Sequence, residues 1–316
     1  MIVEQARLFQ YRSPLNYPLP LKGSEQWVRE GIIVELRSGD CFGYGEAAPL
    51  ADFSQESLSG AYEQLQQLCG SVESMTGFDR SRYSPSVVFA VESAIWSLQQ
   101  PRWLAAPVCA PLLQGKTQDI LSRLTQWKIP WPAEFKLKIG RGSIDQDINR
   151  IHSVLEILPR ETRLRLDANQ RWTIEEAIRV GRQLPSERIA YIEEPTSNSE
   201  QFPLFYQETG VFYALDETVQ DRRYTFRPHK GLAALILKPT LVGGVDRCKC
   251  LIEAARCAGI RAVFSSSFES SVGIHVLQQL SAQLTPDELP GLDTLSAFQK
   301  PLVLNYPQPG QKIDVF

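Results

Sequence analysis

Hydrophobic and polar positions change their period along the chain at about residue 100. In the first hundred residues, the stretch GIIVELRSGDCFGYGEAAPL predicts two strands joined by a turn at Ser38-Gly39-Asp40. Two helices are predicted after this hairpin, one from about Gln55 to Cys69 and one that begins at Ser84 and Pro85. A sheet followed by helices is typical of an α+β domain.

The rest of the chain alternates between strand-like and helix-like runs. Strand-like runs occur at EFKLKI, TRLRLDA, IAYIEEP, FYALDE, LAALILKP and RAVFSSS, and helical runs separate most of them. The helical run TIEEAIRVGRQL begins with a capping box formed by Thr173 and Glu176, and DRCKCLIEAARCAG ends at Gly259. This repetition predicts a (β/α) barrel. An open doubly wound sheet is the alternative, but no G-x-G-x-x-G motif opens any of the helices.

The first of these strand-like runs carries two lysines on one face. Phe135, Leu137 and Ile139 alternate with Lys136 and Lys138, so the apolar side chains face one way and both lysines face the other. Burying unpaired charge is costly. We therefore expect negatively charged partners for these lysines inside the protein.

Carboxylates at the ends of three successive strands supply such partners. In barrels of this kind, functional groups gather at the C-terminal ends of the strands. Asp167, Glu193 and Asp216 occupy these positions, with Lys138 on one side and Lys238 on the other. Three carboxylates repel one another unless a cation neutralises them, so we expect a hard divalent ion such as Mg²⁺. A lysine beside that ion could remove the α-proton of a substrate carboxylate and give an enediolate.

Each of these residues also has a purely structural interpretation. A lone carboxylate at a strand end commonly caps the next helix or pairs with a lysine, and a lysine pair can form a solvated face. Arg165 shares its face with Asp167 and is either a substrate-facing cation or an ion-pair partner. The run SSSFESSVG either donates backbone N–H groups to an anion or caps a helix.

Composition narrows the class of partner. The 316 residues are 43% hydrophobic and 22% charged, with a net charge of -3 and dispersed lysines and arginines. This balance argues against nucleic acid or an anionic membrane surface and favours a small-molecule substrate, while the oligomeric state stays open. No apolar run approaches the ~20 residues of a membrane span. Six scattered cysteines and no secretory signal predict a cytoplasmic protein with reduced thiols.

The motifs resemble the enolase superfamily and, within it, the o-succinylbenzoate synthase family. The resemblance covers nearly the whole chain and depends on KLK, RLDANQRW, IAYIEEP, LDET, LILKPTLVGG, SSSFESSVG, LPGLDTL, GYGEAAPLADFSQES and SPSVVFAVESA. It implies an α/β fold, with an α+β capping domain at residues 1–103 and a modified TIM barrel, (β/α)7β, at residues 104–295. A C-terminal tail at residues 296–316 would return toward the cap.

The same resemblance implies an activity and a role for each matching residue. The implied Mg²⁺ ligands are Asp167, Glu193 and Asp216. Lys138 would remove the α-proton of 2-succinyl-6-hydroxy-2,4-cyclohexadiene-1-carboxylate. It would return that proton to the departing hydroxyl in a syn dehydration to 2-succinylbenzoate, a step of menaquinone or phylloquinone synthesis. Lys238 would stabilise the enediolate from the opposite face, and Lys136 would position Lys138 and depress its pKa.

Other residues are expected to hold the substrate. The cap segment SPLNYPLPLKGS has no regular period and would be the loop that closes over the substrate. The candidates for substrate contact or support are Lys136, Arg165, Asn169, Ser265, Ser266, Ser267 and Gly291.

Three alternative functions stay open at this point. An N-succinylamino acid racemase or another racemase or epimerase of the superfamily is the nearest, because two facing lysines can exchange a proton on either face. Dipeptide epimerases carry a second aspartate where GLDTLSAF has Leu295, which counts against dipeptides. A Schiff-base aldolase with Lys138 or Lys238 as nucleophile and a non-catalytic binding module are the others.

Overall fold

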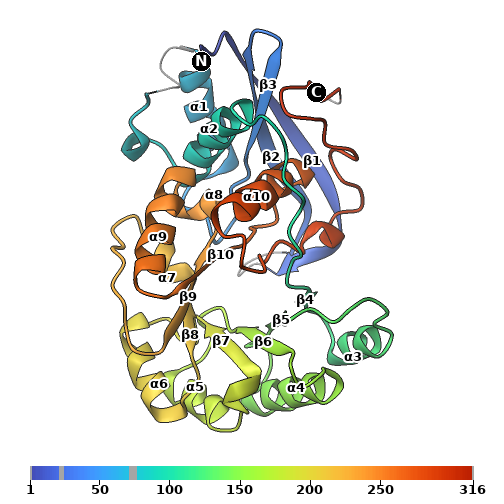
Figure 1. Ribbon diagram of the computed structural model, residues 1–316, viewed down its shortest axis with the longest axis vertical. Coiled ribbons are helices and arrows are strands. Elements are labelled where there is room, and N and C mark those ends of the chain that lie inside the picture. Colours follow the sequence, from blue (N-terminus) through green and yellow to red (C-terminus); the bar gives the residue numbers. More distant parts are fainter. Residues whose placement is uncertain (1, 21–24, 71–76, 315–316) are drawn as a thin grey trace.

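The structure of the protein, a computed structural model, describes residues 2–20, 25–70 and 77–314. An antiparallel sheet with two helices lies at one end of the molecule, and a curled parallel sheet surrounded by helices lies at the other (Figure 1). Within the described ranges, no helix has both the length and the apolar character that crossing a membrane requires. The domain boundaries expected from the sequence stay a prediction.

The cap sheet has the order β1-β2-β3, formed by β1 Gln5–Pro20, β2 Glu25–Ser38 and β3 Cys41–Ala47. The predicted hairpin is confirmed, because β2 ends at Ser38 and β3 begins at Cys41. The expectation of an irregular loop from Ser13 onward is wrong up to Pro20. These residues continue β1, with a shift of register between Pro14 and Leu19. The rest of that expected loop, residues 21–24, lies outside the described residues.

Two helices cover the cap sheet, α1 Leu58–Cys69 and α2 Pro85–Leu98. Helix α1 begins three residues later than predicted, because the Ser57 side chain caps it by accepting a hydrogen bond from the Gly60 N–H at 3.1 Å. Helix α2 begins at Pro85 as predicted, and Ser84 takes the N-cap position, but its side chain makes no capping hydrogen bond. It packs closely on β3 because Gly45 has no side chain, and a Cβ atom there would lie 1.9 Å from the Ala90 carbonyl oxygen.

Seven parallel strands form the second sheet, in the order β10-β9-β8-β7-β6-β5-β4. Their bounds are β4 Leu112–Leu113, β5 Glu134–Lys138, β6 Arg163–Asp167, β7 Ile189–Glu193, β8 Tyr213–Leu215, β9 Leu232–Leu237 and β10 Arg261–Phe264. The order follows the chain, as it does in a barrel and not in a doubly wound sheet.

A short segment around Gly291 closes the gap between β10 and β4. Ser265 and Gly291 form an isolated parallel bridge, and the Gly291 N–H donates to the Phe264 carbonyl at 2.8 Å. On the other side, the Ala110 N–H donates to the Pro290 carbonyl at 3.0 Å. The segment therefore takes the eighth strand position, which confirms the (β/α)7β architecture.

Helices connect the barrel strands and cover their outer face (Figure 1). They are α3 Thr117–Thr125, α4 Ile144–Ile157, α5 Ile174–Gly181, α6 Phe202–Thr209, α7 Glu217–Gln220, α8 Pro239–Val242, α9 Val245–Cys257 and α10 Ser271–Leu284. Short 3₁₀ helices lie at Arg80–Arg82, Ser186–Arg188, Ser199–Gln201 and Leu295–Ala297. The capping box of Thr173 and Glu176 is confirmed at the start of α5. Helix α9 ends at Cys257, two residues before Gly259, whose φ is +68°.

Two cap carboxylates bind the N-termini of barrel helices. Glu46 accepts hydrogen bonds from the backbone N–H groups of Ser270 and Gly273, both at 2.8 Å, at the start of α10. Glu92 accepts from the Val245 N–H at 2.5 Å at the start of α9. Each carboxylate satisfies free N–H groups at the positive end of a helix, so these contacts hold the cap on the barrel.

The tail runs beside the cap sheet (Figure 1). Phe298 forms an isolated bridge with Leu15 of β1, and Gly310 forms one with Phe42 of β3. Further along the tail, the Ile313 N–H donates to the Tyr44 hydroxyl at 2.8 Å. The segment that follows the barrel therefore adds to both strands of the cap that flank β2.

Candidate active site

A cavity of about 290 Å³ lies where the C-terminal ends of the barrel strands meet the cap. The cap contributes apolar and acidic side chains to its wall, namely Leu19, Leu50, Asp52 and Phe53. The barrel contributes all three lysines predicted for the site, Lys136, Lys138 and Lys238. Its volume is at the small end of ligand pockets, which suits one small molecule.

Strand alternation and register bring the charged groups to the same level of the barrel. On β5 and β6, Leu137 and Leu166 are completely buried in the main hydrophobic cluster, outside the barrel, while the intervening residues face inward. Lys138 is paired with Asp167 across β5 and β6, and Asp167 with Glu193 across β6 and β7. Asp216 follows β8 directly.

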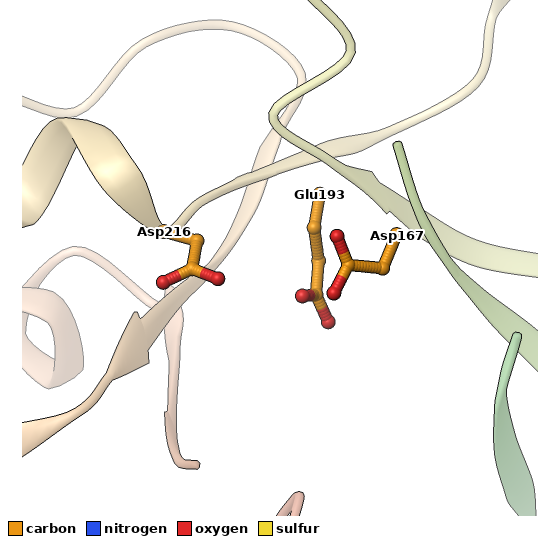
Figure 2. A group of neighbouring side chains, drawn as sticks. All are labelled: Asp167, Glu193 and Asp216. Carbon is orange, nitrogen blue, oxygen red and sulfur yellow. The ribbon is translucent and has the colours of Figure 1, made fainter. Parts of the chain in front are cut away.

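The three carboxylates converge as the sequence predicted. Each offers one oxygen, and these oxygens all lie within 4.8 Å of one another (Figure 2). Asp167, Glu193 and Asp216 are each at most 1% exposed. Three buried carboxylates that aim at one point, without cysteine or histidine, form a donor set that fits a divalent cation.

Each carboxylate also contacts an ammonium group. Lys136 Nζ lies 2.8 Å from Asp167 Oδ2 and 2.5 Å from Glu193 Oε2. Lys138 Nζ lies 2.6 Å from Asp167 Oδ2, and it donates to Asn169 Oδ1 at 2.8 Å. The two inward lysines of β5 therefore have the negatively charged partners that the sequence predicted.

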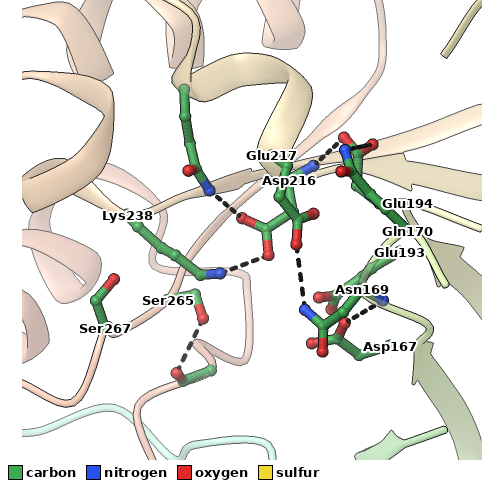
Figure 3. Close-up of polar contacts among 12 residues, drawn as sticks. Asp167, Asn169, Gln170, Glu193, Glu194, Asp216, Glu217, Lys238, Ser265 and Ser267 are labelled. Atoms are coloured by element: carbon green, nitrogen blue, oxygen red, sulfur yellow. Dashed lines mark hydrogen bonds and ion pairs between the residues drawn. The ribbon is translucent and has the colours of Figure 1, made fainter. Parts of the chain in front are cut away.

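Lys238 lies across the site from this pair. Lys238 precedes the first residue of α8, and its Nζ lies 2.5 Å from Asp216 Oδ2 (Figure 3). Lysines thus reach the three carboxylates from two sides of the barrel, from β5 and from the end of β9.

The three lysines differ in how their surroundings change their acidity. Burial lowers the pKa of Lys138, and the charges of Lys136 and Lys238 lower it further against the attraction of Asp167. Burial also acts on Lys136, but Asp167 and Glu193 outweigh it and raise its pKa. For Lys238, Asp216 likewise outweighs burial and raises the pKa. Lys138 is therefore the lysine whose surroundings favour the neutral amine.

The surroundings also shift the pKa values of two of the carboxylates, in opposite directions. Burial raises the pKa of Glu193 to about 7, although Lys136 opposes the shift. Burial would also raise the pKa of Asp167, but the ammonium groups of Lys136 and Lys138 lower it below its usual range. Asp167, which contacts two lysines, is thus held as an anion more strongly than Glu193.

Arg165 lies in a lower layer of the barrel and does not line the cavity. It is 1% exposed, and its Nε donates to Glu134 Oε2 at 2.5 Å. Glu134 also pairs with Arg163 and Arg261 at the N-terminal ends of the strands. Of the two interpretations that the sequence left open, the contacts favour the structural ion pair.

The other candidates lie in the cavity wall. Asn169 and Ser265–Ser267 face the cavity, as does Gly291. Asn169 donates to Glu217 Oε1 at 3.2 Å and has a positive φ of 47°, which a non-glycine residue rarely adopts (Figure 3). Ser265 Oγ donates to the Gly291 carbonyl at 3.2 Å, so that part of the wall is built from the barrel closure itself.

Several wall residues were not among the sequence candidates. Glu217 is adjacent to Asp216, and burial raises its pKa to about 8. Arg141 and Arg171 follow β5 and β6 and are exposed at the wall. These residues lie beyond the strand ends, so strand alternation could not indicate them, although the LDET motif already included Glu217.

The sequence matches family models and known proteins over both its cap and its barrel. Residues 3–98 match the family model described as MenC, N-terminal domain, and residues 132–307 match the model Enolase C-terminal domain-like. The o-succinylbenzoate synthase of Aliivibrio fischeri strain MJ11 is 34% identical over 313 residues, covering 96% of this chain and 94% of that protein. The o-succinylbenzoate synthase of Pectobacterium atrosepticum is 35% identical over 309 residues, with the same coverage.

Solved structures show the same fold. The o-succinylbenzoate synthase of Thermosynechococcus elongatus BP-1, complexed with Mg in the active site, has a TM-score of 0.74 at 25% identity, over 94% of this chain and 95% of that chain. A dipeptide epimerase from Cytophaga hutchinsonii has a TM-score of 0.81 at 21% identity, over 98% of this chain and 92% of that chain. The fold of cap and barrel together is thus shared with a protein titled dipeptide epimerase, whereas the relatives named o-succinylbenzoate synthase also match this chain in sequence, at 34–35% identity over nearly its whole length. With its cap, its barrel and its buried carboxylates, the chain belongs to the o-succinylbenzoate synthase family of enzymes within the enolase superfamily.

Proposed function

We propose that this enzyme uses Mg²⁺ to dehydrate 2-succinyl-6-hydroxy-2,4-cyclohexadiene-1-carboxylate to 2-succinylbenzoate, in the synthesis of menaquinone or phylloquinone. One observation carries the proposal: lysines reach a buried group of three carboxylates from opposite sides of a closed barrel. The relatives named o-succinylbenzoate synthase support the choice of substrate. A cytoplasmic location is part of the proposal, and the six free thiols support it.

Asp167, Glu193 and Asp216 would hold the Mg²⁺ ion. When bound, the ion would stabilise the negative charge that develops on the substrate carboxylate as the α-proton leaves. The preference for Mg²⁺ over other divalent ions is supported by the all-oxygen donor set and by the Mg complex of the Thermosynechococcus enzyme.

Lys138 would act as the base. Its lowered pKa gives it a larger neutral fraction than a solvent-exposed lysine, and Asn169 and Asp167 fix the direction of its Nζ. The proton it takes from the α-carbon would go to the departing hydroxyl, which leaves as water as the ring becomes aromatic. Lys136, which contacts both Asp167 and Glu193, would keep Lys138 in position and lower its pKa.

Lys238 would stay charged and stabilise the enediolate from the opposite face. Asp216 raises the pKa of Lys238, so at neutral pH Lys238 is the protonated partner of Lys138. The opposite pKa shifts of Lys138 and Lys238 therefore support a division of labour in which one lysine moves the proton and the other balances charge.

The substrate carries a second carboxylate on its succinyl arm. Arg141 and Arg171 give the cavity wall two further positive charges, and the described part of the chain shows no carboxylate ion-paired with either. We assign them to the attraction of this dianionic substrate. Ser265, Ser266, Ser267 and Gly291 would form the polar surface along the succinyl arm.

A racemase of N-succinylamino acids is the second candidate. The two lysines that face the carboxylates from opposite sides favour it, because each could exchange an α-proton on its own face. Incubation of an N-succinylamino acid in D₂O would reveal this activity as deuterium at the α-carbon together with loss of optical rotation.

The deciding experiment is an assay with the cyclohexadiene carboxylate that follows the aromatic product by absorbance. We expect turnover with Mg²⁺, none after EDTA treatment, and full recovery when Mg²⁺ is added back. Borohydride in the presence of substrate should trap no adduct, because no Schiff base forms. Turnover that survives EDTA, or a lysine adduct after borohydride, would instead favour the aldolase.

A further inference from the structure

Arg29, in the cap strand β2, is buried and forms no ion pair with any carboxylate of the described residues, although its charge opposes the rise that burial causes in the pKa of Glu269. Its side chain is 1% exposed. All of its hydrogen bonds given by the structure go to backbone carbonyl oxygens. A buried guanidinium usually pairs with an acid, so a set of carbonyl acceptors indicates that this residue holds backbone in place.

One acceptor is the carbonyl of the adjacent Glu30 in β2, and the other four belong to two loops from different parts of the chain. In the cap, Arg29 Nη1 donates to the Pro49 carbonyl at 2.8 Å, and Nη2 donates to the Ala48 carbonyl. In the barrel, Nε donates to the Phe268 carbonyl at 3.0 Å, and Nη2 donates to the Ser267 carbonyl at 3.3 Å. One planar group therefore joins the loop that follows β3 to the loop that follows β10.

Both loops form walls of the cavity. Leu50 and Phe53 come from the first, and Ser267 and Phe268 come from the second. Phe268 has a φ of +58°, a conformation that a non-glycine residue keeps only where its surroundings hold it. Arg29 binds the carbonyl of that residue, which makes it part of those surroundings.

We propose that Arg29 is a positioning residue that sets the distance between the cap wall and the barrel wall of the cavity, and thereby the affinity for the substrate. The proposal rests on the proposed function, because it concerns the same cavity. Arg29 does not line the cavity, and it acts through the two loops. Arginine suits this role because its five N–H donors lie in one rigid plane, whereas lysine offers three donors at a single point.

The test compares Arg29→Met and Arg29→Lys with the wild type and with Glu92→Gln. Glu92 is a matched control, because it also joins the cap to the barrel through hydrogen bonds to backbone groups, but at α9. We expect Arg29→Met to raise KM about tenfold or more while kcat stays within about threefold, since the lysines and carboxylates stand on barrel strands. Arg29→Lys should recover part of the loss. Glu92→Gln should leave KM unchanged.

Hydrogen–deuterium exchange provides a readout that does not depend on turnover. In Arg29→Met we expect faster exchange in residues 48–54 and 265–270, with the barrel strands unchanged. In Glu92→Gln any increase should fall at residues 245–250. If Arg29→Met does not accumulate as folded protein, the kinetic constants and the hydrogen–deuterium exchange are both measured on Arg29→Lys.

Two outcomes separate failure of this proposal from failure of the proposed function. An active wild type with an unchanged KM in both Arg29 variants, or exchange that rises uniformly over the molecule, would overturn the role of Arg29. A wild type that does not turn over the cyclohexadiene carboxylate would overturn the proposed function, and the exchange pattern would still decide whether Arg29 holds the two loops.

Discussion

Lys138 and Lys238 carry the same ammonium group in different surroundings. Two neighbouring lysines and burial act against the charge of Lys138, whereas Asp216 stabilises the charge of Lys238. The difference arises from their strands, because β5 places two lysines two residues apart on one face. A division between base and cation therefore follows from where each strand ends.

Replacing Lys138 by alanine tests this division. We expect kcat to fall by about a thousandfold or more, because general base catalysis typically contributes two to four powers of ten. The measurement is aromatic product formation, with the melting temperature as a check that the fold persists. Near wild-type turnover in Lys138→Ala would assign the base to another residue.

At the residue scale, the sequence predicted which way a strand side chain points better than which layer of the barrel it occupies. Strand alternation correctly places Asp167 and Arg165 on the same inward face, but it does not say which layer each occupies. Arg165 lies two residues before Asp167 and one layer below it in the barrel, where it binds Glu134 at the start of β5. Residues beyond the strand ends, such as Glu217 at the start of α7 and Arg141 in a loop, follow no strand period, so their place in the wall depends on tertiary structure alone.

At the scale of elements, the predicted capping box of Thr173 and Glu176 is confirmed at the start of α5. A second capping box, formed by Ser143 and Gln146 at the start of α4, was not predicted, although its residues fit the same pattern. These signals lie within four residues of sequence and do not depend on the rest of the fold. By contrast, β1 extends to Pro20 through a segment without regular period, because β2 pairs with it and the tail binds it at Phe298.

Replacing Thr173 by alanine should lower the free energy of unfolding by about 1 kcal/mol. The Thr173 Oγ1 accepts from the Glu176 N–H at 3.2 Å, and alanine leaves that donor without its partner. Urea unfolding measures the change, and Thr173→Ser is the control that keeps the cap. Because α5 starts beyond the cavity wall, kcat and KM should not change. A loss of activity at unchanged stability would contradict this account.

At the scale of the whole molecule, the tail packs an aromatic residue on the last barrel helix. The rings of Tyr306 and His275 stack with centroids 3.8 Å apart, and Trp103 meets His275 edge-on at 4.9 Å. Burial lowers the pKa of His275 to about 4, from an ordinary value of 6.5. The ring is therefore neutral in the folded protein over a pH range in which an unfolded histidine is charged.

This shift predicts a loss of stability in acid. Between pH 6.5 and pH 4 the unfolded chain binds more protons at His275 than the folded chain, so the free energy of unfolding falls as the pH falls. By pH 4 the contribution reaches about 2–3 kcal/mol. The variant His275→Phe keeps the stack but cannot titrate, and urea unfolding at several pH values should show a shallower decline than in the wild type. Parallel declines would contradict the assignment to His275.

The tail contacts also affect how the protein folds during its synthesis. Asn16 donates a hydrogen bond to the carbonyl of Phe298, 282 residues further along the chain, and Phe298 pairs with Leu15 close to the cavity wall at Leu19. A ribosome therefore releases the N-terminal sheet long before it synthesises the segment that secures the sheet's edge. We expect nascent chains that already contain every lysine and carboxylate of the site to remain inactive and dependent on chaperones until these last residues emerge.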